Sequence, residues 1–591
     1  MKRYLLLFVA FILVFSVVGT FSTAKPVAKA QDAPSGTFLG TWPYTLPPDH
    51  HLNGFDASGL DTNLGVVYRQ IVELTPAYYM WATNEYLPML ATEWGFTEDN
   101  SAYYIKLRED ALWSDGTPIT ADDVIATYAL ARITNYFSVF SGGYISDVVK
   151  VDDYTVNFVF AGEPSLVAER GILKSSISAA ASYGDLPQRA LEMIASGAAS
   201  DSEEWAALKT EITEFRPTQL LASGPYTYTL DDVSDSYMTL HWQPNSIFSG
   251  SVKFGEIRLW AGETEATTPL VLSGDIAHST NVYPPSTQQA FADAGIRLLI
   301  MPRMYGPALL FNHDVHPFEV KEVRQAIAYL IDRSENAFLT NGLGATATVY
   351  MAGLLDSSVP VLMNQEDIDK LNRYELNRDK AAELLESVGF AKNSDGKWAD
   401  ADGNVIAAEY KFPAEFADFS AAAQNAIDQM NEFGFDITPV ATPWQQTAQD
   451  IRDGNFELSV WSWASGSPFA SRQFFGPIQR FNYVGLTDGQ KGMNFPMEFE
   501  YNGETINLDQ MIKDASNGLD IEVQKQRAGE IALIINDLMP FVPLNVILST
   551  EPWNEDLLSG GPADDDPILQ NPSADHFIVL YLLNGTISPA N

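Results

Sequence analysis

Acidic and aromatic side chains supply most of the groups in this sequence that could take part in chemistry. Seven His and no Cys among 591 residues leave little material for a zinc site and none for a thiolate nucleophile or a disulfide. The H-E-x-x-H, G-x-S-x-G and Walker A patterns are absent. The 76 Asp and Glu residues guarantee carboxylate pairs, but none stands out as a glycosidase dyad. We therefore predict no enzyme, no catalytic residue, no metal and no cofactor.

Two short strings resemble cofactor or ion motifs, and both are better explained by local structure. Gly342–Ala347 fits a relaxed G-x-G-x-x-A pattern, but it follows a predicted helix, whereas a dinucleotide site follows a strand. Asp400 and the pair Asp402-Gly403 hint at calcium, but the other ligands of an EF-hand loop are missing. A hairpin turn is the favoured interpretation.

The charge balance excludes one class of partner. Lys and Arg total 35 against 76 acids, which gives a formal charge of −41. A chain this negative repels phosphate backbones, so we predict no nucleic-acid partner. The 46% of hydrophobic residues supports a large buried core, and the length indicates two to four folding units.

Residues 1–30 are predicted to be a secretory signal. Lys2 and Arg3 precede an apolar stretch from Tyr4 to Val18, and an Ala-Lys-Ala site ends at residue 30. An uncleaved anchor helix is the alternative, because the apolar stretch is only slightly short of a membrane span. No later segment approaches eighteen consecutive apolar residues. We expect the remaining chain in the periplasm or outside the cell, associated with the envelope.

Strand and helix patterns alternate along the rest of the chain. Residues 102–107 and 154–160 alternate between apolar and polar side chains, as strands do. Thr120 with Asp123 forms a predicted capping box. Apolar residues recur at helical spacing over 323–331, and Asn377 is a predicted helix cap. The pattern predicts a mixed α/β (α+β) fold.

Several separated strings resemble those of family 5 extracellular solute-binding proteins, the oligopeptide- and dipeptide-binding proteins of ABC importers. They occur in the family's order and extend over most of the chain. The strings are Leu90–Trp94, Tyr103–Arg108, Trp113–Val124, Ser223–Tyr226, Phe311-Asn312, Val323–Ile327, Ile331–Arg333, Asn377–Leu385 and Asp453–Leu458.

This resemblance implies a two-lobe, periplasmic-binding-protein-like fold with a hinge and an extra subdomain inserted in the first lobe. By motif position, the first lobe is 31–75 plus 219–305 plus 536–591, the inserted subdomain is 76–218 and the second lobe is 306–535. Trp113–Thr120 is structural in the family, so we predict no ligand contact there.

The chain departs from the peptide binders of that family at one stretch. They carry a W-x-A-D-x-x-D-P-like sequence in which an Asp pairs with the α-ammonium of the peptide. Here the two acidic positions are Ala464 and Ser467, within Trp461–Pro468. A buried ammonium without an anion costs several kcal/mol, about the desolvation penalty of an unpaired charge. Peptide binding by that anchor is therefore disfavoured.

Two tryptophans occupy the same stretch. On an extended segment Trp461 and Trp463 project to one side, opposite Phe456, Leu458 and Val460. Indole faces beside small hydroxyls suit a sugar ring, which packs its C–H face on an aromatic plane. Core packing is the alternative for both. We predict Trp461 and Trp463 as ligand contacts.

Trp42, Tyr44 and Asn53 complete the predicted ligand site. They lie where the family's first strand leaves its lobe, and packing is again the alternative. Their segment is similar to that of family members that bind β-linked oligosaccharides, such as cello- or manno-oligosaccharides.

Together these features predict an extracytoplasmic receptor of an ABC importer. It captures a short oligosaccharide by hinge closure, delivers this small-molecule solute to a membrane permease and acts as a monomer. An oligopeptide or dipeptide receptor of the same fold is the first alternative. A secreted glycoside hydrolase and a surface protein that has lost its ligand are the others. The sequence leaves the sugar, its linkage and the mode of retention at the cell surface open.

Overall fold

The structure of this protein is a computed structural model that describes residues 33–42, 46, 50–56, 58–486 and 489–590. The predicted signal, residues 1–30, and the predicted contact Tyr44 lie outside these residues. None of the described helices is long and apolar enough to cross a membrane.

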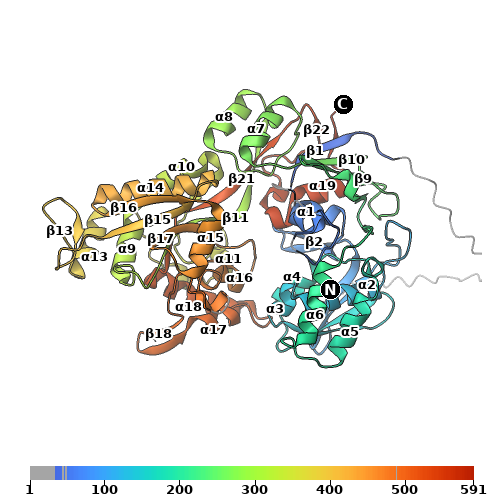
Figure 1. The fold of residues 1–591 in the computed structure, drawn as a ribbon, viewed down its shortest axis with the longest axis horizontal. Coiled ribbons are helices and arrows are strands. Elements are labelled where there is room, and N and C mark those ends of the chain that lie inside the picture. The colour runs from blue at the N-terminus through green and yellow to red at the C-terminus, as the bar shows by residue number, and fades with distance from the viewer. Residues whose placement is uncertain (1–32, 43–45, 47–49, 57, 487–488, 591) are drawn as a thin grey trace, which may run out of the picture. The chain divides into compact units, whose positions relative to one another are not determined.

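The N-terminal strand joins a four-stranded sheet. β1 (Thr37–Thr41) pairs in parallel with β10 (Glu256–Trp260), followed by the antiparallel β9 (Tyr237–Trp242) and β8 (Tyr226–Thr227). Phe38 and Ile257 are fully buried on this sheet. Strands far apart in the sequence therefore share one core, which also includes α1 (Leu60–Tyr68) and α19 (Phe577–Leu583) (Figure 1).

A second four-stranded sheet lies within the predicted inserted subdomain. Its order is β4 (Ala91–Phe96), β5 (Ala102–Leu107), β7 (Thr155–Phe160) and β6 (Ile145–Lys150), all antiparallel. The capping box of Thr120 and Asp123 is confirmed at the start of α2 (Ala121–Thr134). α5 (Leu186–Ala195) and α6 (Glu203–Glu214) pack on α2. The strands predicted over 102–107 and 154–160 are confirmed as β5 and β7.

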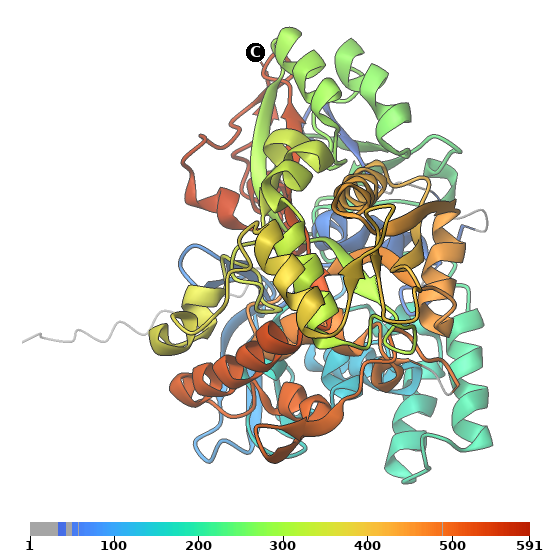
Figure 2. The same ribbon diagram turned by 90° about the vertical axis from the view of Figure 1, so that its left-hand side faces the viewer.

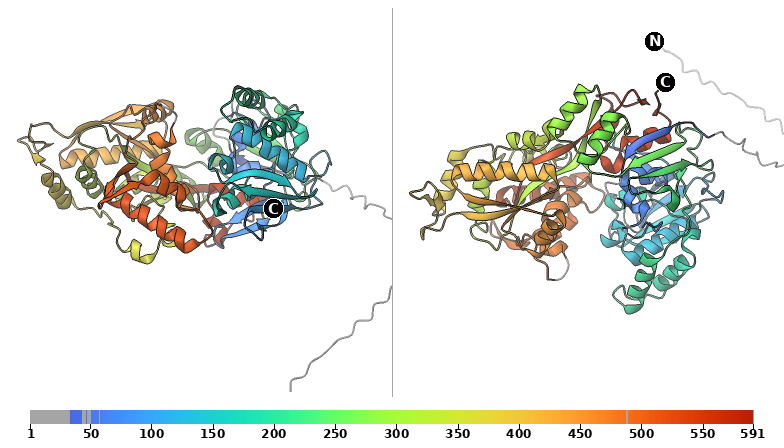
Figure 3. Two further views of the ribbon diagram at one scale, coloured as in Figure 1. Left: turned by 90° about the horizontal axis from the view of Figure 1, so that it is seen from below. Right: turned by 45° about the horizontal axis from the view of Figure 1, so that its top comes forward.

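The largest sheet has seven strands and contains the two longest. The order is β12 (Ala345–Ala347), β21 (Asn545–Trp553), β11 (Arg297–Phe311), β17 (Leu458–Trp463), β15 (Ala407–Pro413) and β16 (Asp436–Thr442), with β20 (Phe541–Pro543) also paired to β11. Figure 3 shows α14 (Ala417–Phe433) running along β15 and β16. α9 (Lys321–Leu330) and α13 (Arg378–Ser387) confirm the predicted helices, and Asn377 caps α13 through the Lys380 amide. α18 (Ile521–Leu538) is the long orange-red helix in Figure 2.

The two motif-like strings are local structure, as expected. Gly342–Gly344 is a single 3-10 turn directly after α10 (Arg333–Asn341). Asp400 Oδ1 accepts hydrogen bonds from the amides of Asp402 and Asn404, so this carboxylate closes its own turn.

Buried apolar side chains form several separate clusters. The first combines residues between 38 and 301 with residues between 553 and 587, whereas two others contain residues between 304 and 547. β11 contributes Leu299 to the first cluster and Leu309 to another, so this strand passes from one hydrophobic core to the next. The lobe boundaries given above stay a prediction, and a strand of this kind is suited to act as the hinge.

Candidate functional site

Trp463 is a core residue in this structure. Its side chain is 0% exposed, and its Nε1 donates a hydrogen bond to the Asn545 carbonyl at 3.0 Å. The indole packs in a hydrophobic cluster with Phe541 and Phe474. A buried ring with a satisfied N–H offers no face to a ligand, so this placement gives the predicted contact no support.

The prediction of which side chains share one side of β17 is correct in part. Trp461 pairs with Ala308 and Trp463 with Gly306. Trp463 lies in the cluster of Ala308, and Trp461 packs against that cluster but also contacts Phe419 of the cluster that holds Leu458 and Val460. Phe456, predicted to share the side of Leu458, lies instead with Trp463. The side predicted to face solvent or ligand is thus largely a second hydrophobic core, because helices remote in sequence cover it.

Replacing Trp463 tests this packing role. Trp463→Ala should lower the free energy of unfolding by about 3–5 kcal/mol, as large-to-small changes in cores do. Trp444→Ala, at a side chain 41% exposed, should cost far less. Chemical denaturation of both variants measures the difference, and equal losses would contradict a core position for Trp463.

Trp461 belongs to a run of aromatic rings. Its ring centroid lies 6.2 Å from that of Phe416 and 6.1 Å from that of Phe419. Phe416 stacks at 6.0 Å on Trp444, which is 41% exposed. Trp461 is half-buried, so part of its side chain stays exposed to solvent.

Asn53 and Trp42 hold the chain that follows β1. Asn53 is fully buried, and its side-chain amide donates to the carbonyls of Ile212 and Phe215. Its side-chain oxygen accepts from the Phe55 amide, so this side chain ties the segment to the end of α6 and has no support as a ligand contact. Trp42 is half-buried, and its indole lies against Gly65. A side chain at position 65 would put its Cβ 2.6 Å from the Trp42 ring.

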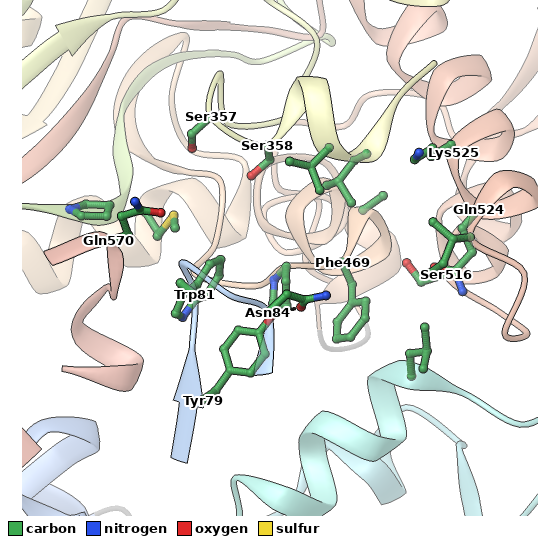
Figure 4. A pocket seen from close by; sticks show the side chains of 18 of the residues that line it. Tyr79, Trp81, Asn84, Ser357, Ser358, Phe469, Ser516, Gln524, Lys525 and Gln570 are labelled. Atoms are coloured by element: carbon green, nitrogen blue, oxygen red, sulfur yellow. Dashed lines mark hydrogen bonds between the residues drawn. The ribbon is translucent and has the colours of Figure 1, made fainter. Parts of the chain in front are cut away.

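A cavity of about 770 Å³ is the main candidate for a ligand site, and its volume lies in the range of small-molecule pockets. Its aromatic lining is Tyr79, Trp81, Tyr86 and Phe469. Its neutral polar lining is Asn84, Ser357, Ser358, Ser516, Gln524 and Gln570. Figure 4 shows Ser357 and Ser358 across from Tyr79, Trp81 and Asn84, with Phe469 beside Asn84.

The first wall is the hairpin of β2 (Ala77–Met80) and β3 (Glu85–Pro88). Trp81 Nε1 donates to Asp575 Oδ2 at 2.8 Å, and the Trp81 amide donates to Asn571 Oδ1. The Arg170 guanidinium lies 4.5 Å from the centroid of the Tyr79 ring and 2.6 Å from Asp575. Lys174 Nζ lies 2.8 Å from the same carboxylate. This buried ion network fixes the aromatic rings before any ligand arrives, which lowers the entropy cost of binding.

The opposite wall continues the Trp461–Pro468 stretch. Pro468, Phe469 and Ala470 line the cavity at the start of α16 (Ala470–Phe474). Gln473 is fully buried and donates to both Ser358 Oγ and the Ser467 carbonyl at 2.8 Å. The stretch singled out in the sequence therefore leads into the cavity wall, although its second tryptophan does not.

Two charged residues line the cavity. Glu169, in α4 (Leu166–Leu173), accepts a hydrogen bond of 2.7 Å from the Tyr103 hydroxyl, and burial raises the pKa of its carboxyl. Lys525 of α18 lies 3.0 Å from Glu522, which neutralises its ammonium. The cavity therefore offers one carboxylate, one paired cation, aromatic faces and short polar groups.

One buried cluster has the composition of a metal site. His278 Nε2 lies 2.7 Å and His576 Nε2 3.0 Å from Glu551 Oε2, and all three side chains are buried. However, His576 Nδ1 accepts a hydrogen bond from the Ile578 amide, which puts the ring proton on Nε2. That N–H then donates to the Glu551 carboxylate, which leaves no lone pair on Nε2 for a metal. His278 and His576 both contact the Glu551 carboxylate, while His278 Nδ1 is buried without a hydrogen-bond partner among the described residues.

Sequence reasoning missed the hairpin aromatics and Phe469. The string Tyr78-Tyr79-Met80-Trp81 was a usable signal, because aromatic residues at alternate strand positions share one face of a strand. The cavity also takes residues from segments near positions 302, 357, 516 and 570. Only the folded chain brings these segments together.

Comparisons with known proteins show the protein family to which this chain belongs. Residues 85–478 match the bacterial extracellular solute-binding proteins, family 5, so the chain belongs to this family. Its sequence is 23% identical over 435 residues to a probable ABC transporter-binding protein of Deinococcus radiodurans, a match that covers 65% of this chain and 66% of that protein. It is 22% identical to an oligopeptide-binding protein OppA of Lactococcus lactis subsp. lactis, over 68% of this chain and 69% of the relative.

Solved structures show the same fold. A periplasmic oligopeptide-binding protein of Thermotoga maritima superposes with a TM-score of 0.75 at 18% identity, over 94% of this chain and 99% of that one. Its mannohexaose-bound form superposes with a TM-score of 0.71 at 17% identity, over 95% of this chain and 99% of that one. AppA of Bacillus subtilis in complex with a nonapeptide superposes with a TM-score of 0.66 at 17% identity, over 95% of this chain and 100% of that one. The predicted periplasmic-binding-protein-like fold is confirmed.

Proposed function

We propose that this solute-binding protein captures a short oligosaccharide of the cello- or manno-type and delivers it to the permease of an ABC importer. The lining of the cavity is the observation that carries this proposal. Rings of Trp81 and Phe469 provide planes on which the C–H face of a sugar can pack. Serine, asparagine and glutamine side chains beside them match sugar hydroxyls as donors and acceptors.

A peptide ligand is the second candidate, because named relatives bind oligopeptides or dipeptides and AppA was solved with a nonapeptide. The same comparisons include a neighbour with mannohexaose. Within this chain, Ala464 and Ser467 stand where the family's peptide binders carry acids. The absence of that anchor supports the sugar over the peptide.

Hinge closure is the proposed mechanism. The lining combines Tyr79 and Glu169, which precede β11 in the sequence, with Ser358 and Phe469, which follow it. A ligand that contacts both walls stabilises the closed arrangement by its differential affinity and shifts the population toward it. Closed lobes then present one composite surface to the permease. Binding in this way needs no catalytic group. We propose that the protein acts as a monomer and that it lies outside the cytoplasmic membrane. Trp461 stays a proposed further contact.

A thermal-shift screen tests the proposed class of ligand. Cello- and manno-oligosaccharides should raise the melting temperature, because a ligand that binds the folded state stabilises it by mass action. Dipeptides and tripeptides should not. Stabilisation by peptides alone would contradict the proposal, and shorter products from an incubated oligosaccharide would instead indicate a glycoside hydrolase.

Phe469→Ala tests the stacking contact. Its ring forms part of the cavity wall, so its loss should weaken oligosaccharide binding about tenfold, or about 1.4 kcal/mol. Phe338→Ala is the matched control, because that ring is 65% exposed on α10 and lies outside the lining. Isothermal titration measures both variants. Unchanged affinity in Phe469→Ala would exclude this ring from the ligand contact.

A further inference from the structure

Glu169 is a carboxylate in the cavity without a cationic partner. Its Oε1 accepts one hydrogen bond from Tyr103, at 2.7 Å. Within the described part of the chain, no Lys, Arg or His nitrogen lies within ion-pair distance of it. A half-buried carboxylate with a single donor has unused acceptor positions. Because burial raises the pKa of this carboxyl, a ligand that supplies positive charge gains from pairing with it.

The nearest cations are committed elsewhere. Arg170 is the next residue in α4, and its Nη2 lies 2.6 Å from Asp575 Oδ2. Lys174 Nζ lies 2.8 Å from Oδ1 of the same carboxylate. Lys525 on the other wall lies 3.0 Å from Glu522. Each of these cations thus contacts a carboxylate other than Glu169, and Arg170 and Lys174 share one.

Tyrosine hydroxyls lie near this carboxylate. Burial raises the pKa of the Tyr79 and Tyr86 hydroxyls, and the charge of Glu169 raises both further while Arg170 acts in the opposite direction. Glu169 is therefore within electrostatic reach of both hydroxyls. A carboxylate in a cavity that is also lined by aromatic side chains suits an ammonium group. Arg170 lies against the Tyr79 ring, and its guanidinium shares the Asp575 carboxylate with Lys174.

We propose that Glu169 determines specificity by giving the cavity a subsite for a primary ammonium group. This inference rests on the proposed function, and it narrows the ligand to an oligosaccharide that carries a free amino group, an amino sugar. The N-terminus of a peptide could supply the same ammonium, and the experiment distinguishes the two sources.

The ligand side of the test needs no mutation. Three sets of β-1,4-linked oligosaccharides of equal length differ only at C2, with a hydroxyl (cello-oligosaccharides), an N-acetyl group (chitin oligosaccharides) or a free amine (glucosamine oligomers). Isothermal titration of the full chain should give at least tenfold tighter binding of the free amine than of the N-acetylated compound. Dipeptides and their N-acetylated forms provide the peptide arm.

The protein side uses an isosteric variant. Glu169→Gln keeps the shape and the hydrogen bond with Tyr103 but removes the charge, so it should abolish the preference for the amine. Glu203→Gln, on the exposed face of α6 in the same predicted subdomain, makes the same charge change and should keep the preference. Thermal unfolding of both variants identifies any loss of fold.

The outcomes separate the subsite from the proposed function. Equal affinity for the three sugars, or a preference that Glu169→Gln leaves intact, would overturn the ammonium subsite while an oligosaccharide receptor stands. Binding of dipeptides that acetylation and Glu169→Gln both abolish, with no sugar bound, would support the subsite and overturn the oligosaccharide. An absence of binding in every arm would overturn both.

Discussion

Asp575→Asn should lower the free energy of unfolding by about 3–5 kcal/mol, because it leaves two buried cations without their anion. Asp575 is fully buried, and Arg170 and Lys174 both contact its carboxylate. Burial raises the pKa of Asp575, but the charges of Lys174 and Arg170 outweigh burial, and the net pKa lies below its ordinary value. The variant should also weaken ligand binding, since the one amide oxygen of Asn must serve the Trp81, Arg170 and Lys174 groups that now share two carboxylate oxygens.

Urea denaturation at neutral pH measures this loss. Asp564→Asn is the matched control, because Asp564 also pairs with an arginine, Arg297, at 2.5 Å but is 87% exposed. An exposed ion pair contributes about 0–1 kcal/mol. Losses of similar size in the two variants would contradict the structural role of the buried network.

The second large effect concerns Glu551 on β21. Glu551→Gln should cost about 3 kcal/mol at pH 7, because His576 Nε2 contacts both carboxylate oxygens, so the amide NH2 of Gln would put a donor against that N–H. Burial raises the pKa of Glu551, but His576 and His278 outweigh it and hold that pKa well below the ordinary value. A carboxyl with a depressed folded pKa contributes stability above its unfolded pKa, about 4.3, and loses it as the pH falls.

His278 changes the free energy of unfolding in the same direction as the pH falls. Burial lowers its pKa, so the unfolded chain binds a proton first as the pH falls below about 6.5. Unfolding free energies at pH 7, 5 and 3.5 should therefore fall steadily in the unmodified protein. The difference between it and Glu551→Gln should be largest at pH 7 and shrink below about pH 4. Glu555→Gln, 65% exposed on the same segment, is the control. A difference that grows toward acid pH would contradict the assignment.

Local signals predicted much of the fold. Thr120 with Asp123, Asn377 and the Asp402-Gly403 turn each form the cap or turn that their residue types favour. Such features depend on hydrogen bonds over a few residues, which a single sequence displays. The order of the seven-stranded sheet is different, because β21 joins β11 from more than 200 residues away.

The site was predicted less well for the same physical reason. Alternation placed Trp461 and Trp463 on one side of β17, and both pack against one cluster, yet it could not reveal that Trp463 is fully buried there, with its ring centroid 6.4 Å from that of Phe541. Asn53 resembled a ligand amide, but the carbonyls at the end of α6 use its donors. Whether a polar or aromatic side chain meets a ligand depends on which remote segment packs against it.

A crystal structure of the full chain with its tightest-binding oligosaccharide or peptide tests the central claim most directly. We predict a sugar bound in the cavity, with rings packed on Trp81 or Phe469 and hydroxyl or amino groups within hydrogen-bond distance of Glu169 and the lining serines. A peptide in that cavity, or a sugar bound only against Trp444 and Trp461, would contradict this assignment.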